Sequence, residues 1–120
     1  MEAALAAGDK VAATGRALDA AIAQFDRLDV VLNNAGYGML GTLEETTMDE
    51  FRACVETNFF DTVLVCKAAV PHLRKQGQSH IINVASAGGF RPVQGFSAYC
   101  AAKFAVAGLS ETLGMELALM

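Results

Sequence analysis

Two short apolar runs do most to limit what this chain can fold into. One spans Asp29 to Asn33 and reads Asp-Val-Val-Leu-Asn, and the other spans His80 to Ala85 and contains Ile-Ile-Asn-Val. Both are apolar at consecutive positions, so both faces of each strand would be buried, which is typical of a parallel sheet covered by helices. We therefore expect strands that alternate with helices.

Helical patterns lie before, between and after these runs. Helices are predicted at about 17–27, 48–76 and 96–119, and Thr47 to Glu50 forms a Thr-x-x-Glu capping box at the start of the middle one. A further helix at about 2–7 and a short strand at about 10–14 are expected near the beginning. This alternation predicts an α/β fold with a doubly wound (Rossmann-like) parallel sheet, in a single domain over residues 1–120.

The composition argues against several classes of function. With 120 residues, 53% of them hydrophobic and 18% charged, the chain is expected to form one globular domain. A net charge of -4 without a cluster of Lys or Arg argues against nucleic acid as a partner. Charged residues, Gly or Pro interrupt every apolar stretch, so we expect no membrane segment and a cytoplasmic protein. His72 and His80 lack partners at metal-ligand spacing, so no metal site is expected.

A tyrosine and a lysine stand four residues apart in the last predicted helix. In Tyr99-Cys100-Ala101-Ala102-Lys103 this spacing places both side chains on one helix face, one turn apart. A positive charge at about 4 to 5 Å stabilises a phenolate by on the order of 3 to 4 kcal/mol at an effective dielectric near 20. The pair could therefore exchange a proton, but it could equally be a surface pair on an amphipathic helix.

Polar residues follow both predicted strands, at the edge where ligands bind in such a sheet. Asn33-Asn34-Ala35-Gly36 ends the first strand, and Ser86 follows the second, 13 residues before Tyr99. The hydroxyl of Ser86 could meet the phenol across a bound carbonyl, or it could cap a turn. Asn58 interrupts an apolar run in the middle helix, where a buried amide needs hydrogen-bond partners, and it could be a satisfied core residue.

These motifs together resemble the classical short-chain dehydrogenase/reductase family: Asn33-Asn34-Ala35-Gly36, Asn58, Ser86 and Tyr99-x-x-x-Lys103, in this order. The resemblance covers nearly the whole chain. It implies an NAD(P)-dependent oxidoreductase that transfers a hydride between a nicotinamide cofactor and a secondary alcohol or ketone. It also implies a homodimer or homotetramer formed through the two long helices.

The resemblance assigns a role to each catalytic candidate. Tyr99 would be the proton donor or acceptor at the substrate oxygen. Lys103 would favour the phenolate and hold the nicotinamide ribose. Ser86 would hydrogen-bond the substrate oxygen and stabilise charge as the hydride moves. Asn58 would position a water that relays protons from Lys103 to solvent.

Further residues would bind the two ligands. Arg16, directly after the predicted strand at 10–14, would meet the 2′-phosphate of NADP, so NADP is the expected cofactor and NAD is possible. Besides Arg16, the cofactor would contact Asn33, Ala35, Gly36, Tyr99 and Lys103. The substrate would contact Ser86, Phe90, Val93, Phe96 and Tyr99, and the three apolar side chains suggest an apolar ligand.

Parts of the family pattern have no counterpart here. The chain holds no Gly-x-x-x-Gly-x-Gly turn for the cofactor pyrophosphate, no region for a third strand between Arg16 and Ala17, and no loop after Met120 to close over the substrate. We therefore expect an incomplete sheet and a partial record of a longer enzyme. The alternative is a catalytically inactive fragment or nucleotide-binding interaction module of the same fold. Sugar-nucleotide epimerases share the Tyr/Lys pair, but the Asn33-to-Gly36 turn argues against them.

Overall fold

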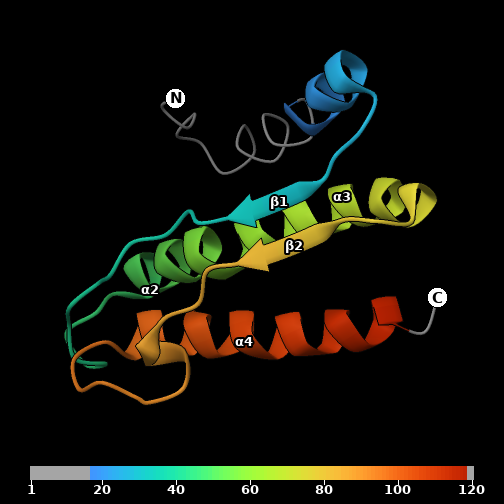
Figure 1. The fold of residues 1–120 in the computed structure, drawn as a ribbon. Coiled ribbons are helices and arrows are strands. Elements are labelled where there is room, and N and C mark those ends of the chain that lie inside the picture. Colours follow the sequence, from blue (N-terminus) through green and yellow to red (C-terminus); the bar gives the residue numbers. More distant parts are fainter. Residues whose placement is uncertain (1–16, 119–120) are drawn as a thin grey trace.

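Two parallel strands, the helices on one of their faces and a further helix at 17–25 make up the described part of the chain. The computed structural model describes residues 17–118. β1 (Val30–Asn33) and β2 (His80–Asn83) lie side by side, and the helical segment between them in sequence crosses back along the sheet (Figure 1). The parallel α/β arrangement predicted from the sequence is confirmed, as a sheet of two strands in the described residues.

The sheet is buried on one face. Val31 pairs with Ile81 in the strand register, and both pack against Ala69 and Leu73 of the helix behind them. Because side chains alternate across a strand, the neighbouring residues point away from this helix. The apolar ones among them are Val30, Leu32 and Ile82, which are 52%, 61% and 49% exposed. The sequence predicted cover on both faces, whereas the described residues cover only one.

The middle helix spans the predicted range but is not a single α-helix. It consists of α2 (Met48–Val55), a π-helical turn η1 (Glu56–Phe60) and α3 (Asp61–Gln76). The predicted capping box is present, since Thr47 Oγ1 accepts from the Glu50 amide at 3.3 Å and Glu50 Oε2 accepts from the Thr47 amide at 2.9 Å. Gly77 ends α3 in the left-handed region, at φ 82°.

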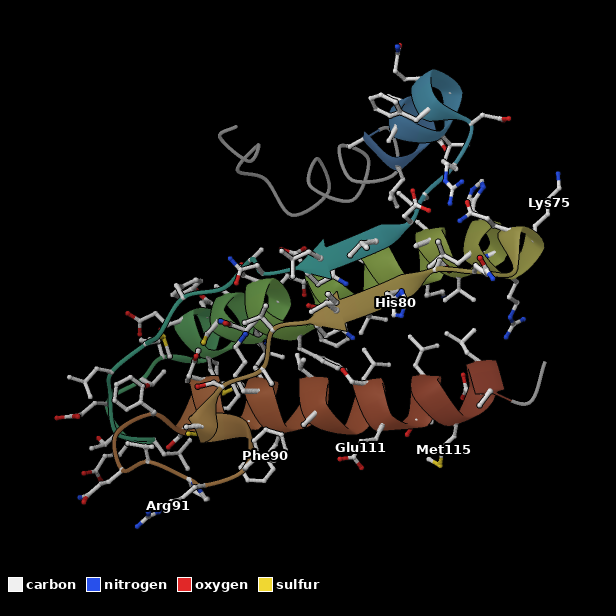
Figure 2. All side chains as sticks on the ribbon, viewed as in Figure 1. Lys75, His80, Phe90, Arg91, Glu111 and Met115 are labelled. Atoms are coloured by element: carbon white, nitrogen blue, oxygen red, sulfur yellow. The ribbon has the colours of Figure 1, made fainter. Side chains whose placement is uncertain are left out.

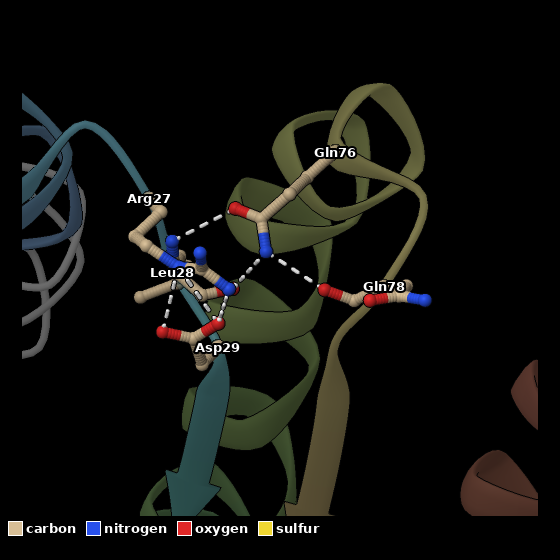
Figure 3. Close-up of polar contacts among 5 residues, drawn as sticks. All are labelled: Arg27, Leu28, Asp29, Gln76 and Gln78. Carbon is tan, nitrogen blue, oxygen red and sulfur yellow. Dashed lines mark hydrogen bonds and ion pairs between the residues drawn. The ribbon is translucent and has the colours of Figure 1, made fainter.

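A glutamine side chain joins the end of α3 to the starts of both strands (Figure 3). Gln76 Oε1 accepts from the Leu28 amide at 2.9 Å, and Gln76 Nε2 donates to Leu28 O at 3.2 Å and to Gln78 O at 2.7 Å. Its amide therefore acts like one residue of a neighbouring strand. At the same edge, the guanidinium of Arg27 pairs with the carboxylate of Asp29.

The remaining elements follow the predicted order. After β2 come a 3₁₀ turn, η2 (Ala87–Gly89), and α4 (Ser97–Ala118), which lies along the same side of the sheet as α3. The helix predicted at 17–27 ends at 25, because Asp26 adopts the left-handed conformation at φ 57°. The helix and strand predicted at 2–7 and 10–14 lie outside the described residues. Between residues 17 and 118, no helix combines the length and apolar character needed to span a bilayer.

Candidate active site

The candidate residues gather where both strands end. β1 and β2 point toward the beginning of α4 and toward α2, so the segments after Asn33 and Asn83 enter the same region as the first turns of α4 (Figure 1). Tyr99 and Lys103 lie in those first turns. The sheet edge predicted from the sequence is therefore the edge at which these residues meet.

Lys103 is held at this edge by a backbone carbonyl just beyond the end of β2. The residue is 5% exposed, and Nζ donates to Val84 O at 3.1 Å. Nζ also lies 5.8 Å from the centroid of the Tyr99 ring. An ammonium carries three donors, so this bond leaves two N–H groups for other partners. A buried positive charge is thus fixed next to a partly exposed phenol.

Asn58 lies at the centre of the π-helical turn, and its side chain explains part of that turn. Its Nδ2 donates to Cys54 O at 2.9 Å, and this carbonyl is the one that an α-helix would pair with the Asn58 backbone amide. At the end of the turn, the Asp61 amide donates to Glu56 O, five residues back. π turns of this kind are frequent at functional sites.

The amide orientation of Asn58 leaves its oxygen free on the side of Lys103. Nδ2 also donates to Tyr37 O at 2.9 Å, while the fully buried Oδ1 has no hydrogen-bond partner in the described residues. A Cβ at Gly36 would lie 2.5 Å from Asn58 Oδ1 and 3.3 Å from Lys103 Nζ. Only a glycine at position 36 lets the loop pass this close to both atoms.

Ser86 caps η2 and lies, like Tyr99, beside Gly88. Its Oγ accepts from the Gly88 amide at 3.2 Å, which is the capping role that the sequence left open. A hydroxyl has a donor and a second lone pair besides, so this bond does not use up Ser86. A Cβ at Gly88 would lie 3.7 Å from Ser86 Oγ and 3.5 Å from Tyr99 Cε1, so both side chains flank Gly88.

A polar network ties the two strand ends to the helices. Asn33 Nδ2 donates to Asn83 Oδ1 at 2.8 Å, and Asn83 Nδ2 donates to Ser110 Oγ of α4 at 2.9 Å. The Cys66 thiol of α3 contacts both asparagines, at 3.6 Å from Asn33 Nδ2 and 3.7 Å from Asn83 Oδ1. Burial raises the pKa of the Cys66 thiol, which keeps it protonated as a weak donor. Asn33 therefore binds across the sheet, while Ala35 and Gly36 lie exposed beyond it.

Comparison with known proteins places this geometry in a family. The family model described as short chain dehydrogenase matches residues 4–120. The chain belongs to the short-chain dehydrogenase family. A 3-ketodihydrosphingosine reductase of Bacteroides thetaiotaomicron is 45% identical over 104 residues, which are 85% of this chain and 38% of that protein. This short-chain dehydrogenase thus spans well under half the length of that relative.

Solved structures of similar fold carry both nicotinamide cofactors. A structure of ElxO with NADP bound matches with a TM-score of 0.88 and 30% identity, over 95% of this chain and 46% of that one. An NAD+-bound xylitol dehydrogenase matches with a TM-score of 0.85 and 28% identity, over 90% and 42% of the two chains. The fold of this short-chain dehydrogenase is therefore an incomplete Rossmann-like sheet, as expected.

The apolar substrate candidates of this short-chain dehydrogenase do not all lie together. The Phe96 ring packs edge-on against Tyr99, with centroids 6.2 Å apart. Phe90 and Val93 are 69% and 51% exposed, and Figure 2 shows Phe90 beside α4 at the outer side of the molecule. Of the three, only Phe96 packs on Tyr99 among the described contacts. Arg16 lies outside the described residues.

Several residues that build the site were not predicted from the sequence. Tyr37 supplies a backbone carbonyl to Asn58, for which no side-chain pattern could give a signal. Gly89 lets η2 rest on α4, since a Cβ there would lie 2.7 Å from Lys103 O. The Gly88-Gly89 pair was the one available signal, because adjacent glycines often mark a close backbone approach. Ser110 is one hydroxyl among several in α4, and nothing in the sequence distinguishes it.

Proposed function

We propose that this short-chain dehydrogenase transfers a hydride between NADP, or NAD, and a secondary alcohol or ketone, with Tyr99 as the proton donor or acceptor. The observation that carries the proposal is the buried Lys103 ammonium, fixed on Val84 O and 5.8 Å from the Tyr99 ring. The relative that reduces a 3-keto compound, by its name, supports a ketone as substrate.

Tyr99 and Ser86 would act on the substrate oxygen. The phenol would give its proton to the oxygen of a ketone during reduction and take it back from an alcohol during oxidation. Ser86 would donate its hydroxyl hydrogen to the same oxygen, since its bond from the Gly88 amide uses only a lone pair. The ammonium of Lys103 would stabilise the phenolate that remains after the proton leaves.

Asn58 and Lys103 would restore the proton. The unpartnered Asn58 Oδ1 and the remaining N–H groups of Lys103 lie on the same side of Gly36. A water there would accept from Lys103 and donate to Asn58, since a buried acceptor without a partner is costly unless water serves it. The proton would then pass from solvent through Lys103 to Tyr99.

The residues at the strand ends suit a nicotinamide cofactor. The orphaned Asn58 Oδ1, the spare donors of Lys103 and the exposed turn at Ala35 and Gly36 face one region of the sheet edge. A bound nicotinamide supplies the carbon that gives or takes the hydride. Lys103 would hold its ribose, Asn33 to Gly36 would border it, and Arg16 would bind the 2′-phosphate of NADP.

We also propose a homodimer or homotetramer formed through the outer surfaces of the long helices. Phe60, Phe104 and Met115 are 46%, 43% and 63% exposed on η1 and α4, which supports an apolar contact there. Light scattering coupled to gel filtration tests this proposal. Phe104→Glu is expected to shift the mass toward the monomer.

The decisive experiment is a screen of ketones and aldehydes with NADPH and NADH. The Tyr99→Phe variant keeps the ring and removes the proton, so its kcat should fall by about 100-fold or more. Tyr37→Phe is the matched control, because only its backbone carbonyl contacts Asn58. Full activity of Tyr99→Phe would remove Tyr99 from the mechanism. Failure to bind either cofactor in a direct titration would favour an inert module instead.

A further inference from the structure

The Ser110 hydroxyl of α4 is hydrogen-bonded to the end of β2, next to the residue that binds Lys103. Asn83 Nδ2 donates to Ser110 Oγ at 2.9 Å, and Val84, the next residue of the chain, accepts from Lys103 Nζ at 3.1 Å. Ser110 and Lys103 are seven residues apart, which places them on one face of α4 and about 10 Å apart along its axis. Two neighbouring residues at the end of β2 therefore bind α4 at two separate points.

Two hydrogen bonds to the strand end restrict the position of α4 more than one hydrogen bond can. A single hydrogen bond lets a helix pivot or slide about it, whereas two points along the axis fix both its axial position and its rotation. The buried residues of α4 all lie between Ala98 and Val106 in the described chain. Ser110 thus binds the strand from a part of α4 that lies beyond its buried residues, where packing contributes less to the position of the helix.

The hydrogen-bond directions also fix the orientation of the side-chain amides of Asn83 and Asn33. The Ser110 hydroxyl donates to Val106 O at 2.7 Å, so toward Asn83 it acts only as an acceptor. Asn83 must then present its NH₂ group to Ser110 and its oxygen to Asn33 Nδ2, at 2.8 Å. One hydroxyl therefore orients a chain of polar groups from α4 through β2 to β1.

We propose that Ser110 is a positioning residue for the reaction: its hydroxyl, through Asn83, holds α4 where Lys103 reaches Val84 O and where Tyr99 lies, like Ser86, beside Gly88. The inference rests on the proposed function for its kinetic consequences. A structural hydroxyl that only satisfied its own helix, by bonding the carbonyl four residues back, would have no effect on Tyr99.

The test compares Ser110→Ala with Thr112→Ala in the purified protein. Thr112 is exposed in the same helical turn, so its variant removes a hydroxyl without touching Asn83. We expect Ser110→Ala to lower kcat by about tenfold or more with less than about a twofold change in the substrate KM, because small misplacements of reacting groups cost rate. Ser110→Thr keeps the hydroxyl and should restore kcat, and Thr112→Ala should leave it unchanged.

A second readout does not depend on activity. The chain has two tyrosines, so ¹⁹F NMR of protein containing 3-fluorotyrosine gives two signals, assigned with Tyr37→Phe. Tyr99 lies about 16 Å along α4 from Ser110, too far for a direct effect of the missing hydroxyl. We expect Ser110→Ala to move the Tyr99 signal and Thr112→Ala to leave it in place. Ser110→Cys, of similar volume and weaker as an acceptor, serves if the alanine variant does not fold.

The outcomes separate the two proposals. An unmoved Tyr99 signal in Ser110→Ala or Ser110→Cys overturns the positioning role, as does an equal response of Ser110→Ala and Thr112→Ala. A parent protein without activity on any ketone would count against the proposed function alone. The NMR comparison would then still decide whether Ser110 sets the position of Tyr99.

Discussion

The ammonium of Lys103 donates to the carbonyl oxygen of Val84 at 3.1 Å, one residue beyond the end of β2. Lys103 as a whole is 5% exposed, and it carries its charge beside the Tyr99 ring. A backbone carbonyl just past β2 therefore holds the positive charge of the candidate active site at this edge of the sheet.

Removing that charge should abolish most activity. Lys103→Met keeps much of the side-chain length and removes the cation, so we expect kcat to fall by about 100-fold or more, as the phenolate of Tyr99 loses its counter-charge. Steady-state oxidation of NADPH measures it. Lys67→Met, on an exposed position of α3, is the matched control and should retain full kcat. Equal rates in both variants would contradict the role of Lys103.

Two glycines of the α4 region should respond to alanine with opposite signs. A Cβ at Gly89 would lie 2.7 Å from the backbone oxygen of Lys103, which cannot give way cheaply, so Gly89→Ala should lower the free energy of unfolding by about 1–3 kcal/mol. A Cβ at Gly108 meets nothing within 4 Å, so Gly108→Ala should raise it by about 0.5–1 kcal/mol. Urea denaturation of both variants measures the difference, and a stabilised Gly89→Ala would refute the close packing.

Loss of the Asn58 amide should destabilise the middle helix. Asn58→Ala leaves Tyr37 O and Cys54 O without the donor that now serves them, at 2.9 Å each. We expect the free energy of unfolding to fall by about 1–3 kcal/mol, measured by urea denaturation. Asn34→Ala, at an exposed position, should change it little. If the two variants are equally stable, the buried amide is not needed for the helix.

The capping box should make stability depend on pH. Hydrogen bonds from the side chain and backbone of Thr47 hold the pKa of Glu50 below its ordinary value of 4.5. A carboxyl with a lowered pKa in the folded state stabilises above its unfolded pKa, and this contribution is lost as pH falls through the folded value. Glu50→Gln should therefore be less stable than the parent at pH 7, and the difference should shrink below pH 4.5 and vanish once the pH falls below the lowered pKa of Glu50. Thermal unfolding across pH measures it, and Glu44→Gln is the control.

Cofactor choice should depend on Arg16. If its guanidinium binds the 2′-phosphate, Arg16→Gln should raise the KM for NADPH by about 10- to 100-fold, because charge-assisted hydrogen bonds are worth about 1.5–3 kcal/mol. The KM for NADH, which lacks that phosphate, should stay nearly constant. Arg74→Gln, in the last turn of α3, is the control. Parallel losses with both cofactors would argue against phosphate binding.

The sequence predicted the elements whose signals are local. The Thr47-to-Glu50 box and Gly77 bound the middle helix where the structure has them, because caps depend on a few adjacent residues. The spacing of Tyr99 and Lys103 likewise placed both on one face of α4. Apolar runs gave both strands and their parallel pairing.

Features that depend on partners far away in the sequence could not be predicted from local patterns. The π turn at Asn58 requires Tyr37 O, which comes from a loop 21 residues earlier. The bond between Asn83 and Ser110 joins residues 27 positions apart and uses side chains that are common in turns and helices. Asp26 ended its helix early through a backbone conformation that the apolar spacing does not encode.

The number of residues in the π turn also determines how α3 is rotated about its axis. Successive residues of an α-helix are rotated by about 100°, so one residue more or less in Glu56–Phe60 would turn α3 by that angle about its axis. The buried stripe of Thr62, Cys66, Ala69 and Leu73 would then leave the sheet. Point substitutions in this turn should therefore be tolerated far better than a single deletion, which would misalign a helix of 16 residues at once.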